Sequence, residues 1–127
     1  MYAEILDGLR SRYEQTRKKG SPGYGAAMSL SFLFGVNSAA ILTIVDACLS
    51  HDLAAVMWLY DHKIVVLAFG VVTAWGHVQY AKYHGVYDKV GPAMSPSWWP
   101  WFMGYCVVSA ALTILATCFA YMSRPSA

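Results

Sequence analysis

Three long apolar stretches dominate the pattern of this chain. Residues 25–49 contain one charged side chain, Asp46, and residues 64–81 and 98–122 contain none. About twenty apolar residues cross the ~30 Å hydrocarbon layer of a membrane as an α-helix. Helices of soluble bundles keep a polar face, which these stretches lack. The pattern therefore predicts an all-α membrane protein with three transmembrane helices rather than a soluble three-helix bundle.

A shorter amphipathic helix is predicted ahead of the first span. In residues 1–19 apolar side chains recur at three- and four-residue steps and charged ones occupy the other faces, until Gly20-Ser21-Pro22-Gly23 breaks the helix. Such a helix either lies at the interface on anionic lipid headgroups or docks on a partner. The first interpretation assigns five side chains to the membrane surface: Arg10, Arg12, Arg17, Lys18 and Lys19.

The distribution of basic residues predicts the orientation. If the chain starts inside, seven Lys and Arg residues lie on the cytoplasmic side and two lie outside, which the positive-inside rule favours. We expect an inner (plasma) membrane protein with a cytoplasmic N-terminus and an external C-terminus. Its segments are the inner-leaflet helix 1–19, span 25–49, outer loop 50–63, span 64–81, inner loop 82–97, span 98–122 and outer tail 123–127. Within the outer loop, residues 54–60 are apolar and are read as an interfacial turn of helix or loop.

Small side chains follow stripes along the spans and predict helix packing. Ser31 and Gly35 belong to a four-residue repeat of small residues in the first span, Gly70 lies in the second span, and Thr113 lies in the third. Small residues let helices approach closely in lipid. We expect these stripes to pack together or against other membrane subunits or copies of the same chain, with the lining of a pore as the alternative.

Two polar side chains in the first span need partners. Asn37 lies near its middle, where an unpaired amide is costly, so we expect a hydrogen bond to a neighbouring helix. Asp46 lies one turn from the outer end. In an antiparallel hairpin it reaches the depth of Lys63, so the two are expected to form an ion pair that fixes the register.

His77 is the ionisable side chain within the second span and is a functional candidate for that reason. Its simplest role is a hydrogen bond to Ser29 or Ser31 of the first span. As a cofactor ligand it is a weak candidate, because the other two spans contain no histidine and a second axial ligand would come from another subunit. No set of His, Cys, Asp and Glu has the spacing of a metal site, and no cofactor is predicted.

Composition and motifs reduce the number of function classes to be considered. The chain is 57% apolar and 13% charged, and it has no phosphate-binding loop, nucleophile elbow or plausible carboxylate pair, so no enzyme is expected. Its basic cluster is too small and too mixed with acids to favour nucleic acid. The first hypothesis is an accessory or assembly subunit of a larger membrane complex. The alternatives are a homo-oligomeric channel or proton- or ion-conducting pore, and an electron-transfer subunit that uses His77.

The chain also resembles a family. A basic N-terminal helix, the segment GSPGYGAAMSLSFLFGVNSAAILTIVD and a span ending in GHVQYAKYHGVYDKV are similar to small three-span bacterial inner-membrane proteins of unassigned function from surface-polysaccharide gene clusters. The Ser21-Pro22 turn and Asn37 fit that pattern. His77 stands where the family often has asparagine, and WWPW before the third span replaces a lysine-rich lead-in. The resemblance implies a bacterial inner membrane and implies no mechanism.

Overall fold

The computed structural model describes residues 1–16, 20–50 and 52–123. Within this part of the chain its regular secondary structure is all helical, as predicted, with five helices: α1 (Tyr2–Thr16), α2 (Pro22–Ser50), α3 (Ala54–Asp61), α4 (Lys63–Tyr83) and α5 (Trp98–Met122). Three of them, α2, α4 and α5, are long and apolar enough to cross a membrane. The predicted fold class is therefore confirmed, with a short helix first and three candidate spans after it.

The helix ends follow local chemistry. α5 covers the predicted span 98–122, whereas α2 begins at Pro22 instead of residue 25. Proline suits the first turn of a helix because its missing N–H would have no partner there, and the Ser21 hydroxyl oxygen accepts a hydrogen bond from the Tyr24 amide (3.4 Å). The apolar stretch 54–60, expected as a turn of helix or loop, lies within the short helix α3.

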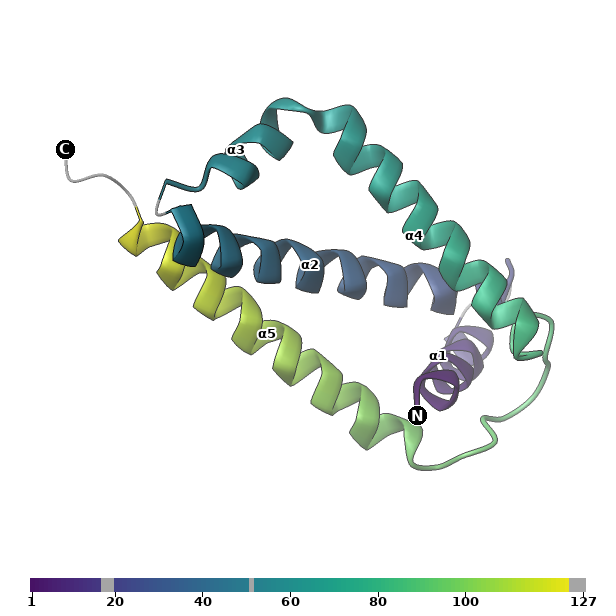
Figure 1. Ribbon diagram of the computed structural model, residues 1–127. Coiled ribbons are helices and arrows are strands. Elements are labelled where there is room, and N and C mark those ends of the chain that lie inside the picture. Colours follow the sequence, from purple (N-terminus) through teal and green to yellow (C-terminus); the bar gives the residue numbers. More distant parts are fainter. Residues whose placement is uncertain (17–19, 51, 124–127) are drawn as a thin grey trace.

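The helices form an open, wedge-shaped arrangement around α2 (Figure 1). α2 contacts α1, α3, α4 and α5. α4 lies close to α2 where α1 crosses the bundle and diverges from it toward α3, whereas α5 approaches α2 toward the other extremity. We call the two extremities the α1 end and the α3 end.

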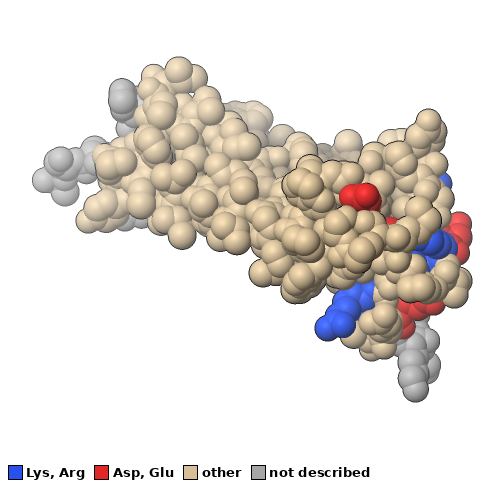
Figure 2. All heavy atoms as spheres, turned by 90° about the horizontal axis from the view of Figure 1, so that it is seen from below, with Lys and Arg blue, Asp and Glu red and all other residues tan. Residues whose placement is uncertain are grey.

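The apolar core lies at the α1 end. Its buried residues come from α1, from the start of α2, and from the end of α4 and the turn after it: Ile5, Leu6, Leu9, Ala26, Ala27, Leu30, Ala81 and Val86. Charged side chains gather at the same end on the face drawn in Figure 2. The rest of the spans is apolar and largely exposed, which suits a surrounding of lipid rather than water.

Two glycines allow the close approach of elements in this core. A Cβ added to Gly8 of α1 would overlap the indole ring of Trp98, the first residue of α5. A Cβ added to Gly23 of α2 would overlap the backbone of Tyr87. Glycine therefore lets α5 pack on α1, and lets the segment after α4 pack on α2.

Candidate functional site

The most highly connected polar group in the described residues is a cluster at the α1 end that we call the charged clamp: Asp7, Arg10 and Glu14 of α1, and Lys89 of the segment between α4 and α5. Arg10 is fully buried. Its Nε donates to Asp7 Oδ1 (3.0 Å) and its Nη1 donates to Glu14 Oε2 (2.6 Å). Its Nη2 lies 2.9 Å from Asp7 Oδ1. The spacing of three and four residues places both acids on the same helix face as Arg10.

The clamp holds the backbone of the segment between α4 and α5. Arg10 donates to the carbonyl oxygens of Lys89 (3.0 Å) and Gly91 (2.8 Å). In return, the amide of Gly91 donates to Glu14 (3.1 Å) and the amide of Met94 donates to Asp7 (2.9 Å). A long segment without a helix is thereby fixed against α1, because its backbone groups find partners in charged side chains.

Electrostatics favour the ionised form of Asp7. Burial alone would raise the pKa of Asp7, but hydrogen bonds from the Lys89 ammonium, the Met94 amide and Arg10, together with the Arg10 charge, lower it overall. Lys89 Nζ lies 2.6 Å from Asp7 Oδ2. Two acids therefore face two bases, and the buried guanidinium is neutralised.

The basic residues assigned to the membrane surface do not share one environment. Arg12 is exposed, but Arg10 is buried in the clamp and does not lie at the surface expected for it. The reason is that Asp7, Glu14 and two backbone carbonyls supply the charge and hydrogen bonds that a headgroup would supply. Arg17, Lys18 and Lys19 lie outside the described residues. α1 packs against α2 and α5 of its own chain, and whether it also meets a lipid surface or another protein stays a prediction.

His77 connects α4 to α1. Its Nδ1 lies 2.8 Å from the Thr73 carbonyl oxygen, which can only accept, so Nδ1 carries a proton. In the neutral imidazole Nε2 is then the acceptor, and the Tyr2 hydroxyl donates to it across 2.6 Å. The expected partners of His77 were Ser29 or Ser31. Ser29 bonds instead to the Tyr13 hydroxyl (2.7 Å).

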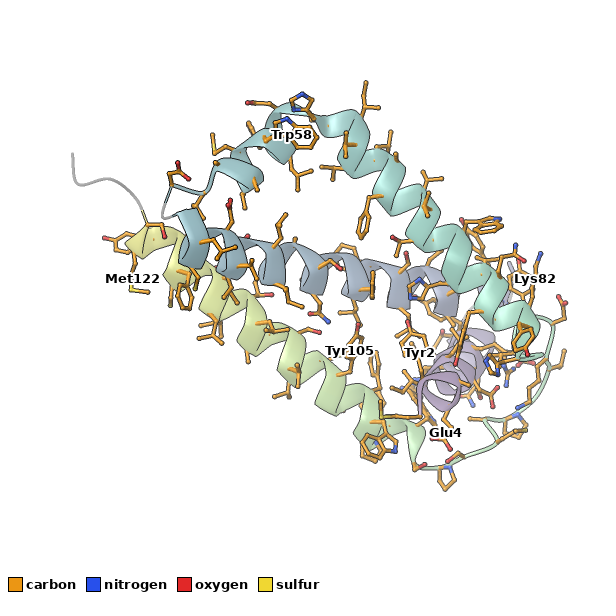
Figure 3. The ribbon with its side chains drawn as sticks, in the orientation of Figure 1. Tyr2, Glu4, Trp58, Lys82, Tyr105 and Met122 are labelled. Atoms are coloured by element: carbon orange, nitrogen blue, oxygen red, sulfur yellow. The ribbon has the colours of Figure 1, made fainter. Side chains whose placement is uncertain are left out.

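Aromatic rings enclose this hydrogen bond. The Tyr2 ring packs edge to face on Tyr80 with centroids 5.5 Å apart, and the Phe34 ring packs on His77 at 5.8 Å. Tyr2 and Tyr105 lie near each other in the region between α1, α2 and α5 (Figure 3). Burial raises the pKa of the Tyr2 phenol, and the neighbouring Tyr105 and Tyr80 raise it further. Tyr2 is therefore a neutral donor at physiological pH.

As a ligand, His77 has both ring nitrogens engaged by Thr73 and Tyr2. A cofactor at Nε2 would have to displace the Tyr2 hydroxyl. In the described part of the chain, no three side chains of His, Cys, Asp or Glu are grouped so that they could hold a metal ion. The arrangement joins α4 to α1 through the hydrogen bond between His77 and Tyr2.

Asn37 does not make the expected bond through its carbonyl oxygen. The residue is buried in α2, and among the described residues its Oδ1 has no hydrogen-bond partner. The hydroxyls of α5 do not reach across, because Ser109 and Thr113 each donate to the carbonyl four residues earlier in their own helix (2.8 Å).

The expected ion pair between Asp46 and Lys63 is also absent among the residues that the structure describes. The Asp46 carboxylate accepts a hydrogen bond from the Val56 amide of α3 (3.0 Å), and the Lys63 ammonium lies over the Tyr60 ring at 5.5 Å. The insertion of α3 between α2 and α4 explains the difference, since a tight hairpin would have brought the two charges together.

The small-residue stripes are only partly used within the chain. Ser31 is buried, Gly35 is half-buried, and Gly70 and Thr113 are exposed. A Cβ added to Gly35 or Gly70 would meet no atom within 4 Å, so neither glycine marks a close approach of two helices of this chain. Whether these positions meet another protein stays a prediction.

The fold and the site define a small multi-span membrane protein whose N-terminal helix is held at one end of the bundle by a buried charged clamp and by the bond between Tyr2 and His77. Comparison with known proteins returned no match among family models, curated proteins or solved structures. The resemblance to three-span bacterial proteins therefore stays a prediction.

Proposed function

We propose that this protein is a non-enzymatic accessory or assembly subunit of a larger membrane complex, and that α4 is the helix that meets its partner. The observation that carries the proposal is the exposure of the first half of α4. Residues 64–72 are all exposed. In an 18-residue apolar stretch of each span, 6% of the residues are buried in α4, against 22% in α2 and 11% in α5.

The residue types on α4 support a helix as its partner. Apolar exposure gives no drive for association in lipid, because lipid tails are as apolar as the side chains. Small residues do give one, since they let two backbones approach and gain van der Waals contact. Gly70 and Gly76 lie open on α4, and a Cβ on either would meet nothing within 4 Å. A second helix can therefore approach α4 closely at either position.

The pore alternative receives less support from the same contacts. It requires several copies to bring His77 and Asn37 to a common axis. His77 is bonded to Tyr2, and Asn37 is buried within its own chain. Both side chains thus contribute to packing inside one copy.

Site-specific photocrosslinking in cells tests the proposal. A photoreactive residue replaces Val72 on α4 or, as the matched control, Val107 on α5, because the two valines are 66% and 64% exposed. We expect position 72 to give a discrete adduct with another polypeptide and position 107 to give lipid adducts only. An adduct between two copies of this chain would move the assignment to the homo-oligomer. Lipid adducts alone from both positions would contradict the proposal.

A further inference from the structure

A groove runs between α1 and the first turns of α2. It has a volume of about 500 Å³ and is lined by Tyr13 of α1 and by residues of α2 that include Tyr24, Met28 and Phe32. Tyr13 forms one wall. Its ring lies against Gly25, where an added Cβ would be 3.2 Å from the ring, and its hydroxyl bonds to Ser29. This wall is fixed by packing and by a hydrogen bond.

The other wall is an apolar stripe. Tyr24, Met28 and Phe32 recur every four residues and so share one face of α2, with exposed fractions of 50%, 37% and 72%. Ligand sites are concave and mainly apolar, with volumes of roughly 300–1,000 Å³. The groove lies at the start of a candidate span, where hydrocarbon meets headgroups, so its shape and chemistry suit an acyl chain.

The sequence around the groove favours an anionic headgroup. Segments 1–19 and 82–97 together hold seven Lys and Arg residues against four Asp and Glu residues. Arg10 and Lys89 are bound in the charged clamp, and Arg17, Lys18 and Lys19 lie outside the described residues. The acids of α1 are engaged, Glu4 with the N-terminal ammonium and the other two in the charged clamp. Arg12 is exposed and directly precedes Tyr13, and it forms no salt bridge among the described residues. Its planar guanidinium suits a phosphate.

We propose that this groove holds one acyl chain of an anionic phospholipid and that the Arg12 guanidinium binds its phosphate. The site is formed by α1 and α2, whereas the partner surface proposed above is on α4. The lipid-binding proposal can therefore fail while the accessory-subunit proposal holds, and the reverse is also possible.

Native mass spectrometry of the full chain in mild detergent tests the headgroup. Phosphatidylglycerol and phosphatidylcholine with identical acyl chains are supplied at equal concentration. We expect one retained phosphatidylglycerol per chain, favoured about fivefold or more over phosphatidylcholine, as one arginine near an anionic group provides. Arg12→Glu removes this preference. Lys82→Glu is the matched control, because Lys82 is an exposed cation at the same end of the molecule, and it leaves the preference intact.

The acyl-chain part of the site is tested by filling the groove. Met28→Trp lowers retention of both lipids, while Met103→Trp on α5, at a methionine of similar exposure (43%), does not. Melting temperatures show that each variant is folded, and Arg12→Ala replaces Arg12→Glu if the latter is not. Equal retention of the two lipids by the natural chain, an equal effect of Lys82→Glu and Arg12→Glu, or unchanged retention in Met28→Trp would each overturn the proposal.

Discussion

Removing Arg10 tests whether the charged clamp holds the structure of the α1 end. Arg10→Ala leaves the buried Asp7 carboxylate with Lys89 and the Met94 amide, and leaves the carbonyls of Lys89 and Gly91 without their donor. Breaking a buried ion pair from one side costs roughly 3–5 kcal/mol. Lys89 still pairs with Asp7, and its side chain is 24% exposed, so we expect the lower figure, about 3 kcal/mol.

Hydrogen exchange measures this loss where it occurs. The amides of Gly91 and Met94 donate to Glu14 and Asp7, so they exchange when the clamp opens. A loss of about 3 kcal/mol corresponds to exchange about 150-fold faster. Arg10→Lys keeps the charge but loses the planar guanidinium, so its exchange rate should lie between those of the natural chain and Arg10→Ala. The control is Arg12→Ala at an exposed arginine. Exchange in Arg10→Ala within about threefold of that control would refute the reasoning.

Three further predictions concern the same end of the molecule. Gly8→Ala forces a methyl group into the Trp98 indole and lowers the thermal midpoint in detergent by the equivalent of about 1–3 kcal/mol; Gly76→Ala, with open space around it, raises the midpoint, and a rise in both variants would contradict the packing. Acid opens the clamp: the folded-state pKa of Asp7 is lowered, so its stabilisation is complete above the unfolded pKa of about 4 and is lost as pH falls further. Exchange of the amide bonded to Asp7 should rise below pH 4 beyond its intrinsic pH dependence, and an unchanged protection factor at pH 2.5 would count against this. Tyr2→Phe removes the donor to His77 and costs about 1–3 kcal/mol, seen as a lower midpoint than in Tyr24→Phe; equal midpoints would show that the bond contributes nothing.

The sequence predicted what depends on local composition. Each span is apolar over its whole length, so its existence and helical type follow from the run alone, and α5 has the bounds that its run indicates. The first helix was predicted from its three- and four-residue periodicity. The spacing of Asp7, Arg10 and Glu14 was also visible and places the three charges on one face. The clamp could have been suspected from that spacing, though not its contact with the segment after α4.

The contacts between distant segments could not be read from the pattern. Burial of Arg10 depends on backbone carbonyls of Lys89 and Gly91, and every residue has a carbonyl, so no residue type signals this partner. The expected pairing of Asp46 with Lys63 assumed a tight hairpin, and α3 separates the two helices instead. Donation to His77 by Tyr2 required knowing that α1 crosses the bundle at the depth of that histidine.

The clamp also sets an order of events during synthesis. Arg10 binds carbonyls that lie 79 and 81 residues later in the chain, and a growing polypeptide emerges from its N-terminus onward. While α2 and α4 are still being made, Asp7 and Glu14 are already present beside Arg10 and can neutralise it within α1. The charged clamp can close only after the chain beyond the second span has been made. Closure of the clamp thus requires that α2 and α4 have both been made.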